Sequence, residues 1–300
     1  MTVRSVAILF HERATDAMVG NYRLWTLVSN WERMGIRVEY LFGIGRETDA
    51  DLLFPHLDLS YIPDDYWAFI QRHPRVVNRA VRDIRKTVYS TNRVGRDEEH
   101  AGPVIVKTVH NCGGFSDVWL NTRSRVMKGA SIRARVLAKL SRQEWLGDTR
   151  FRFARTLPRY FIYDSVRKVP RAVFENQHLI VEKFLPQREG DSYVMNMWIV
   201  FGDRGVGRIL RASDPYVKNA NATLDEFHEP PEEIREWQER LGLTYGKMDF
   251  VMHEGKAVLI DVNTTPTVTG DARSEEYRRL NEGMAAGVDW FERSDRLGRA

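Results

Sequence analysis

Cysteine is nearly absent from this chain, since Cys112 is the only one among 300 residues. A single cysteine excludes a framework of intramolecular disulfides, so the fold depends on its core. With 43% hydrophobic residues, the chain can bury the core of one large domain or of two smaller ones. We interpret Cys112 itself as a bystander, because no general base is assigned to it.

Long apolar runs are also missing. No segment approaches the roughly 20 apolar residues that a helix needs to cross a bilayer, so no membrane partner is expected. The first residues, MTVRSVAILFHERA, contain an apolar run that His11 and Glu12 end too early for a signal peptide. The expected compartment is therefore the cytoplasm.

An overall excess of one charge is absent as well, because 45 basic and 41 acidic residues give a net charge of only +4. Residues 118–172 are an exception, with many more basic than acidic side chains. Such a face suits an anionic partner, either a nucleotide phosphate, an acidic substrate or a nucleic acid. The alternative is a solvated helix face. Because no aromatic interleaving or RNA-binding signature accompanies the charge, no nucleic acid is expected.

What is present begins with a βαβ pattern. A short apolar strand at 5–10, a helix over about 16–34 and a strand at 37–42 predict an open parallel sheet. His11 and Glu12 follow the first strand at its carboxyl end, where α/β sheets usually bind ligands. They are candidates for substrate contact, and surface-loop residues are the plainer interpretation.

The remaining chain predicts a mixture of helices and strands. Residues 58–74 show no sustained period, residues 76–88 predict one amphipathic helix, and 90–102 predict a charged linker. Further on, helix is predicted over most of 115–155 and over 225–241, and strands at 104–106, from Tyr160, at 178–186, 192–201 and 208–212. Because a glycine turn at 202–207 joins consecutive strands, the second half predicts an antiparallel sheet.

Two places carry chemistry in this pattern. Lys107 ends a strand beside the glycine-containing turn 111–114, which suits phosphate because backbone N–H groups can approach oxygen closely. In the stretch YGKMDFVMHEGKAVLIDVNTTPTVT, a hairpin folded at 253–256 brings Asp261 and Asn263 close to Asp249. Oxygen ligands of this kind suit a hard cation such as Mg²⁺. The alternative is a strand pair that ends in solvated polar residues.

The order of these features resembles the ATP-grasp superfamily, which includes D-alanine:D-alanine ligase, glutathione synthetase and the ribosomal-protein glutamate ligases. The resemblance covers about residues 75–270 and rests on Lys107 with its turn, VEKFL, a strand hairpin with Arg211, MDFV and DVNTTP. It implies an α/β (α+β) fold in which an N-terminal βαβ domain, 1–88, precedes two α+β ATP-grasp subdomains, 89–180 and 181–300.

The resemblance also implies roles for individual residues. For the phosphates it implies two lysines, Lys86 and Lys107, and a covering turn with Asn111, Gly113 and Gly114. For the adenine it implies a hinge of Glu182, Lys183, Phe184 and Leu185, and for the ribose a contact from Asp191. Two further residues, Lys218 and Asn221, would assist. Arg211 and Lys107 are the implied catalytic residues: Arg211 stabilises the transferring phosphoryl group, and Lys107 contacts the ATP phosphates. Asp249, Asp261 and Asn263 are the implied metal ligands.

The activity implied is an ADP-forming, ATP-dependent carboxylate-amine or carboxylate-thiol ligase that acts through an acylphosphate. Its cofactors would be ATP and Mg²⁺, or Mn²⁺ in its place, and its substrate a small-molecule or peptide carboxylate that carries negative charge. Two alternatives stay open: an ATP-grasp kinase of small molecules, and a non-catalytic protein that binds nucleotide or RNA. The chain departs from the family at Asp261, where glutamate is usual, which weakens the case for bridging two metals.

Overall fold

The computed structural model describes residues 3–14, 22–122, 144–217, 223–227, 229–268, 279 and 282–297. They form two compact units. The larger unit comprises Met1–Asp58, Ile62–Arg82 and Pro186–Ala300, and the smaller unit comprises Leu59–Tyr61 and Asp83–Leu185. The expected division into 1–88, 89–180 and 181–300 stays a prediction.

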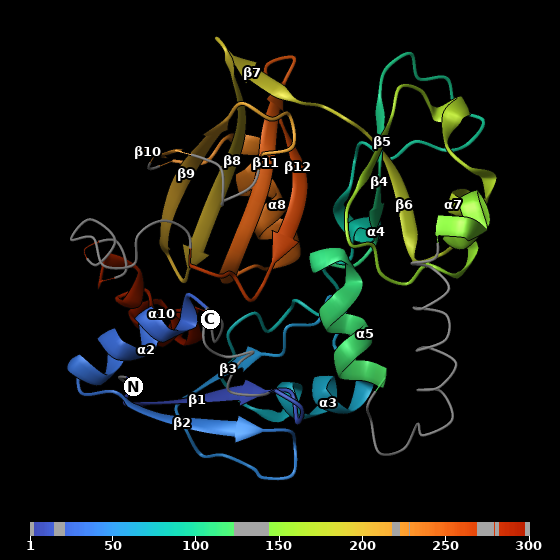
Figure 1. The fold of residues 1–300 in the computed structure, drawn as a ribbon. Helices are drawn as coiled ribbons and strands as arrows, with labels where there is room; N and C mark the ends of the chain where they lie inside the picture. Colours follow the sequence, from blue (N-terminus) through green and yellow to red (C-terminus); the bar gives the residue numbers. More distant parts are fainter. Residues whose placement is uncertain are drawn as a thin grey trace. The chain divides into compact units, whose positions relative to one another are not determined.

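A three-stranded parallel sheet forms the N-terminal part of the larger unit (Figure 1). Its order is β2-β1-β3, and helix α2 joins the first two strands; the bounds are β1 Ser5–Phe10, α2 Leu24–Arg33, β2 Arg37–Phe42 and β3 Leu52–His56. The predicted βαβ unit is confirmed. The first residues of the predicted helix, 16–21, lie outside the described residues, and β3 was not predicted.

The next segment corrects two sequence-based expectations. Residues 58–74, which show no period, contain helix α3 (Asp64–Arg72). The helix predicted over 76–88 is wrong, because only its end forms the single turn α4 (Lys86–Tyr89). Asn78 explains the difference: its φ is +57°, and its side chain bonds the backbone of Thr244 and Tyr245. Tertiary hydrogen bonds therefore override a helical apolar pattern here.

An antiparallel sheet forms the C-terminal part of the larger unit. Its order is β10-β9-β8-β11-β12, with β7 paired to β8, as the predicted antiparallel sheet requires. The strands are β7 Gln187–Glu189, β8 Ser192–Phe201, β9 Arg204–Ala212, β10 Thr223–Phe227, β11 Tyr245–His253 and β12 Lys256–Asn263. The helix predicted over 225–241 is wrong in its first part, since residues to Phe227 belong to β10 and α8 spans Glu232–Leu241 after Pro231.

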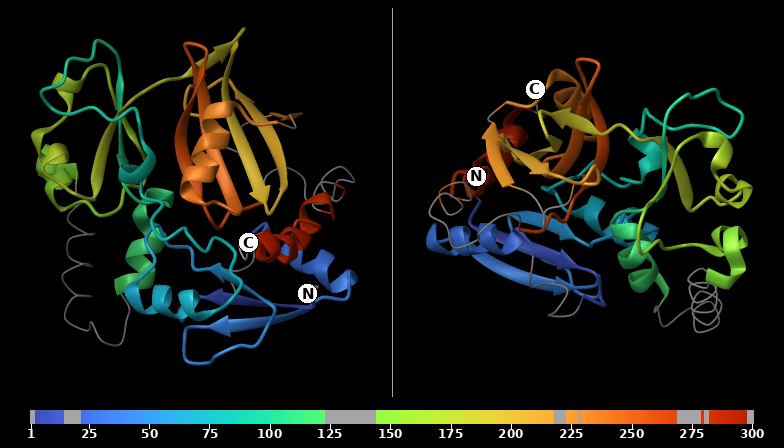
Figure 2. Two further views of the ribbon diagram at one scale, coloured as in Figure 1. Left: turned by 180° about the vertical axis from the view of Figure 1, so that it is seen from behind. Right: turned by 45° about the horizontal axis from the view of Figure 1, so that its top comes forward.

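Helix α8 packs on one face of this sheet, as the views in Figure 2 show. Trp198 of β8 fixes which face, because its Nε1 donates a hydrogen bond of 2.9 Å to Gln238 of α8. Met248 of β11 lies opposite Trp198, so it faces α8 as well. Residues at the alternate positions of β8 and β11 therefore face away from α8.

One hydrophobic core joins both sheets of the larger unit. Its buried side chains come from β1, α2, β8, β11 and α10 (Val288–Leu297), and they include Ile8, Trp31, Phe201, Tyr245 and Phe291. Trp31 donates its Nε1 hydrogen bond to the carbonyl of Ala285 at 3.1 Å. The two sheets therefore share one contiguous hydrophobic core.

The smaller unit contains an antiparallel sheet of order β5-β4-β6. Its strands are β4 Val104–Thr108, β5 Phe161–Tyr163 and β6 Leu179–Lys183, all predicted from the sequence. In its described residues the helices are α4, α5 Phe115–Thr122 and α7 Arg171–Phe174, with 3-10 turns at Cys112–Gly114, Glu144–Phe153 and Val166–Lys168. The middle of the helical stretch predicted over 115–155 lies outside the described residues.

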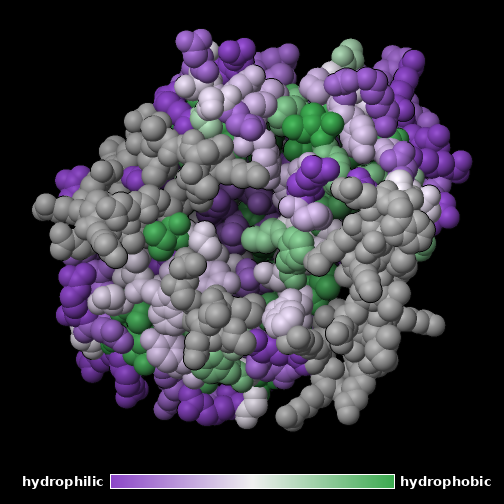
Figure 3. All heavy atoms as spheres, viewed as in Figure 1, coloured by the Kyte–Doolittle hydropathy of each residue, from purple (hydrophilic) through white to green (hydrophobic). Residues whose placement is uncertain are grey.

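Among the coloured atoms of the face seen in Figure 3, hydrophilic side chains predominate, and the apolar ones lie in small separate groups. Within the described ranges, no helix is both long enough and apolar enough to span a bilayer.

Candidate functional site

Two carboxylates of the larger unit face each other across the β11–β12 hairpin. Asp249 lies directly opposite Asp261, so both side chains point to the same face of the sheet. A β-bulge produces this pairing, because the register near the turn would set Asp249 opposite Ile260, and it shifts by one residue between Asp249 and Phe250. The predicted proximity of the two carboxylates is confirmed, and their role as metal ligands stays a prediction.

Lys247 is a site residue that the sequence interpretation missed. It precedes Asp249 by two positions on β11, so the period of two places both on the same face. Its Nζ lies 2.8 Å from Asp249 Oδ2, and the two side chains are only 15% and 9% exposed. The acidic face thus contains a largely buried ion pair, which supplies one positive charge beside Asp249.

The carboxamide of Asn263 is turned toward the segment that follows β12. Its Oδ1 accepts a hydrogen bond of 2.8 Å from the amide of Thr265 and lies 3.2 Å from the Thr265 hydroxyl. That hydroxyl also donates to Asp58 Oδ1 at 2.8 Å, and the hydroxyl of Tyr22 donates to Asp58 Oδ2 at 3.0 Å. Asp58 therefore anchors the end of β12 to the N-terminal sheet.

These contacts decide how far the residues fit a divalent cation. Asp249 and Asp261 offer hard oxygen ligands on one face, which suits Mg²⁺ completed by water and phosphate oxygens. Asn263 does not fit as a third ligand in this conformation, because its oxygen is engaged by Thr265. Across the described ranges, no three or more His, Cys, Asp and Glu side chains gather where they could hold a metal ion.

The strand register separates Arg211 from the acidic pair. Asp249 lies opposite Met197 of β8, and Met197 lies opposite Arg208 of β9, so Arg208 shares the acidic face. Arg211, three positions later, points to the face on which α8 packs. There its Nη1 lies 2.5 Å from Glu189 Oε2. Arg208, which is buried, is therefore a second arginine to consider beside the predicted one.

In the smaller unit, Lys107 forms a buried ion pair. Its Nζ lies 2.8 Å from Glu182 Oε2, and the side chains are 6% and 0% exposed. Lys107 lies on β4 and Glu182 on the adjacent β6, so the sheet itself holds the two together. The predicted phosphate lysine and the first residue of the predicted hinge are thus direct neighbours.

The predicted phosphate turn lies beside Lys86. The buried Lys86 Nζ donates to the carbonyl of His110 at 3.3 Å and to Asn111 Oδ1 at 3.4 Å. The amide of Asn111 donates to the Ser60 hydroxyl at 2.9 Å, and Ser60 in turn donates its hydroxyl to Asp117 Oδ2 at 2.8 Å. Lys86, Lys107 and Asn111 belong to the same compact unit, whereas the expected division at residue 88 would have set Lys86 apart from the other two.

The two glycines of this turn have a packing role of their own. Gly113 and Gly114 have φ values of +64° and +77°, which favour glycine. A Cβ would lie 2.4 Å from the Leu157 carbonyl oxygen at Gly113 and 2.6 Å from that of Arg155 at Gly114. Close approach of the backbone therefore accounts for both glycines without a ligand.

The backbone of the predicted hinge is partly occupied. The Lys183 amide donates to the carbonyl of Asn92 at 2.8 Å, and the Phe184 amide donates to that of Pro103 at 2.9 Å. For Leu185, no hydrogen bond to another described residue is found. Of these hinge residues, Leu185 therefore keeps the backbone groups most available to an adenine edge.

Several other predicted residues lie at the margin of the site or beyond the described ranges. Asp191 is exposed in the turn between β7 and β8. Lys218 and Asn221 lie outside the described residues. In the described part of the basic stretch, Arg152, Lys168 and Arg171 form ion pairs with nearby acidic side chains, which reduces its net positive charge.

Two histidines have pKa values well below the usual range. Burial lowers the pKa of His56, at the end of β3, to about 3. In the smaller unit, burial and then the charges of Arg155, His110 and Arg85 lower the pKa of His178 to about 4. Both imidazoles are therefore neutral at physiological pH.

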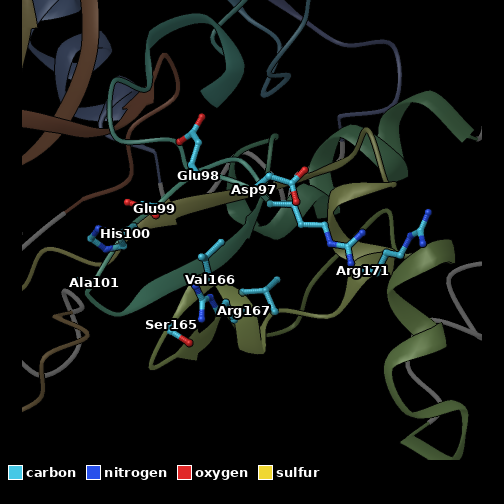
Figure 4. A pocket seen from close by; sticks show the side chains of 11 residues that line it. Asp97, Glu98, Glu99, His100, Ala101, Ser165, Val166, Arg167 and Arg171 are labelled. Atoms are coloured by element: carbon cyan, nitrogen blue, oxygen red, sulfur yellow. The ribbon is translucent and has the colours of Figure 1, made fainter.

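A separate hollow of about 850 Å³ opens in the smaller unit (Figure 4). Acidic side chains of one segment, Asp97, Glu98 and Glu99, and basic side chains of another, Arg167 and Arg171, line it. It is built from 96–101 and 165–171, so it includes none of the predicted site residues.

Comparison with known proteins gives the fold its class. No protein-family model matches the sequence, and no curated protein matches it. Among solved structures, the chain is similar to a RimK domain ATP-grasp protein from Sphaerobacter thermophilus DSM 20745, at 11% identity and a TM-score of 0.50, over 95% of this chain and 99% of that one. It is similar also to the macrocyclase MdnC from Microcystis aeruginosa MRC, bound with the precursor peptide MdnA, at 9% identity and a TM-score of 0.50 over the same shares, 95% and 99%.

The chain therefore has the ATP-grasp fold, and the fold class expected from the sequence resemblance is confirmed. At these identities the similarity establishes the fold alone, so substrate and activity must be argued from the residues.

Proposed function

We propose that this protein is an ATP-dependent ligase that joins a carboxylate to an amine or a thiol and releases ADP. The observation that carries this proposal is the pair Asp249 and Asp261, set opposite each other by a bulge in a chain with the ATP-grasp fold. Phosphoryl transfer depends on positioning and charge neutralisation, and the two aspartates, through the Mg²⁺ they would hold, and the buried lysines would supply both.

Nucleotide binding is proposed for the residues of the smaller unit. Lys86 and Lys107 would neutralise phosphate oxygens, and the backbone of Leu185 would meet the adenine edge. The ion pair of Lys107 with Glu182 holds its ammonium in place before any nucleotide arrives. Asn111, Gly113 and Gly114 would lie against the phosphates as the turn predicted from the sequence.

Charge stabilisation is proposed for the acidic face of the larger unit. Asp249 and Asp261 would hold Mg²⁺, which when bound screens the negative charge of the phosphates. Lys247 and Arg208 share that face and would bring positive charge to the transferring group. Arg211, tied to Glu189, keeps its predicted role only as the alternative to Arg208.

The reaction proposed has two steps. A carboxylate oxygen of the substrate attacks the γ-phosphorus of ATP, the bond from that phosphorus to the β–γ bridging oxygen breaks, and ADP leaves. An amine or thiol then attacks the acyl carbon, phosphate leaves with the electrons of the broken carbon–oxygen bond, and the nucleophile gives up its proton.

Small molecules and peptides are both proposed as classes of carboxylate substrate. The Microcystis macrocyclase was bound with a precursor peptide, so peptides that carry Asp or Glu belong in the panel to be tested.

The test supplies Mg²⁺, ATP and pairs of carboxylates with amines or thiols, and measures ADP and the joined product. ADP release that requires both members of a pair supports the ligase. A stable phosphorylated product without joining would instead indicate a kinase, and tight RNA binding with no nucleotide turnover would indicate a binding protein.

A further inference from the structure

His56 is a buried polar side chain whose hydrogen-bonding groups are unused. Its exposure is 2%, and neither ring nitrogen has a hydrogen-bond partner in the part of the chain that the structure describes. The rings of Phe10 and Tyr22 meet it edge to face, at centroid distances of 5.6 and 4.5 Å. Buried polar atoms usually have a hydrogen-bond partner, so a buried imidazole with two unpartnered nitrogens calls for an explanation.

His56 lies at an edge of the N-terminal sheet where a ligand could use its two nitrogens. It ends β3 and lies level with Phe10 of β1, which in turn lies level with Phe42 of β2, so the three rings form a row on one face. This row stands at the carboxyl ends of parallel strands, where open α/β sheets bind ligands. Phe42 is 54% exposed, and its ring stacks on that of the buried Phe10 at a centroid distance of 5.3 Å.

Backbone strain points to the same place. Asp58, two positions after His56, has a φ of +52°, an uncommon value for a residue other than glycine. Both of its carboxylate oxygens accept hydrogen bonds, from Tyr22 and from Thr265. Strained residues held by their surroundings are typical of ligand sites. Asp58 also connects this row to the end of β12, which carries Asp261 and Asn263.

The charge of the row is close to zero. Burial lowers the pKa of His56, and among the described residues no charged neighbour adds to that shift. A neutral imidazole presents one N–H donor and one nitrogen acceptor. It can pair with a hydroxyl or an amide, whereas an ion placed against it would lose its hydration without gaining an opposite charge.

We propose that His56 and the ring row Phe42–Phe10 form a binding subsite for an uncharged hydroxyl or amide group carried on an aromatic or apolar body. This inference deepens the proposed function and rests on it in one respect, because the molecule bound here would be a substrate of the ligation. It places an uncharged part of the substrate here, whereas the sequence resemblance implies a substrate that carries negative charge.

The test uses the full chain with ¹⁵N-labelled histidine and three fragments that share one ring: benzamide, benzoate and benzylammonium. Benzamide is expected to shift the ring nitrogen resonances of His56 and to bind about tenfold or more tightly than either charged fragment. Equal binding of the three fragments, or no shift at His56 with any of them, would overturn the proposal.

A pair of variants separates binding from folding. His56→Phe removes both nitrogens and is expected to abolish benzamide binding while leaving the melting temperature unchanged or raised. His73→Phe is the matched control, since His73 is a buried histidine of the same unit whose ring nitrogens lie 2.7 and 2.9 Å from the carbonyls of Arg75 and Ala50. This control is expected to lower the melting temperature and to keep benzamide binding. If His56→Phe melts lower and still binds benzamide, the subsite is refuted.

The outcome does not depend on nucleotide turnover. Benzamide binding at His56 without any ATP-dependent activity would leave the subsite standing and remove the ligase. ATP-dependent joining with no fragment bound at His56 would support the ligase and refute the subsite. An internal water held by His56 would give ring resonances that no fragment moves, and this result also counts against the subsite.

Discussion

At the scale of single residues, the proposed function depends most on Asp249 and Asp261, the two proposed ligands of Mg²⁺. Each is expected to be essential to turnover, because without it the Mg²⁺ that neutralises the transferring phosphoryl group would be misplaced, and losing one such electrostatic contribution typically costs about 10²- to 10³-fold in rate. Asp261→Asn and Asp249→Asn should each reduce ADP release by this order. Glu254→Gln, in the exposed turn of the same hairpin, is the control and should leave the rate unchanged.

Retained turnover in either aspartate variant would remove the metal assignment. A rate lost together with the fold would show as a lowered melting temperature, so circular dichroism melts accompany each assay.

The two arginines of β9 offer a sharper comparison. Arg208 shares the face of Asp249, whereas Arg211 points to the opposite face and pairs with Glu189. Arg208→Gln is therefore expected to lower the rate of ADP release more than Arg211→Gln does. The opposite order would show that Arg211 acts in the reaction as the sequence resemblance implies. The face assigned from strand register would then not identify the catalytic arginine.

His56 predicts how stability depends on pH. The unfolded chain binds a proton near the ordinary pKa of 6.5, and the folded chain binds it only near pH 3. Between these values the unfolded state holds more protons, so the free energy of unfolding falls as the pH falls, by at most about 1.4 kcal/mol per pH unit. Urea unfolding from pH 6.5 to 4.5 measures this slope.

His56→Phe should remove that contribution. The free energy of unfolding of this variant should therefore fall less steeply with falling pH than that of the natural chain. Parallel curves for the two proteins would show that His56 is hydrated or partnered in the folded state.

At the scale of elements, the turn Cys112–Gly114 tests whether packing or ligand binding fixes its glycines. Gly113→Ala places a Cβ against the Leu157 carbonyl oxygen, so the backbone must shift, and the free energy of unfolding is expected to fall by about 3 kcal/mol. Gly190→Ala is the control: its φ is +58° and no atom lies within 4 Å of the added Cβ, so only the left-handed cost of about 1 kcal/mol applies.

Urea unfolding of both variants measures the difference. An equal loss for the two would mean that the close approach to Leu157 is relieved at little cost, and that only the positive φ values of the turn favour glycine there.

The elements also show how far the sequence could be interpreted. Strands with clear alternation, such as Ser192–Phe201 and Tyr245–His253, were predicted correctly, because side-chain period alone determines them. The segment 76–88 was not, since Asn78 forms its hydrogen bonds with Thr244 and Tyr245, more than 160 positions away. No local pattern contains such a contact.

The candidate site divides in the same way. Asp249 and Asp261 were found by their spacing around a hairpin, yet strict alternation would have set them on opposite faces, and the bulge that corrects this leaves no sequence signal. Lys247 could have been found, because it lies two positions before Asp249. The face of Arg211 could not, since it depends on the registers of β8, β9 and β11 together.

At the scale of the whole molecule, the shared core of the larger unit predicts that its two sheets unfold together. Trp31 is fully buried between rings of both, with Phe54 at 5.9 Å and Phe201 at 5.5 Å. Trp31→Ala is expected to reduce the free energy of unfolding by about 3 to 5 kcal/mol. Hydrogen exchange should accelerate equally in β1 and β11.

Met34→Ala, at an exposed position of the same region, is the control. It should change neither the free energy of unfolding nor the hydrogen exchange of β1 and β11. Faster exchange in β1 alone would show that the N-terminal sheet is an independent domain.

The central claim is that this ATP-grasp chain activates a carboxylate as an acylphosphate. Trapping with hydroxylamine tests it most directly, because hydroxylamine converts an acylphosphate into a hydroxamate that mass spectrometry detects. With Mg²⁺, ATP and the carboxylate panel, the account predicts ADP and hydroxamate in equal amounts, both lost in Asp261→Asn. ADP release without hydroxamate, or no nucleotide turnover with any carboxylate, would contradict it.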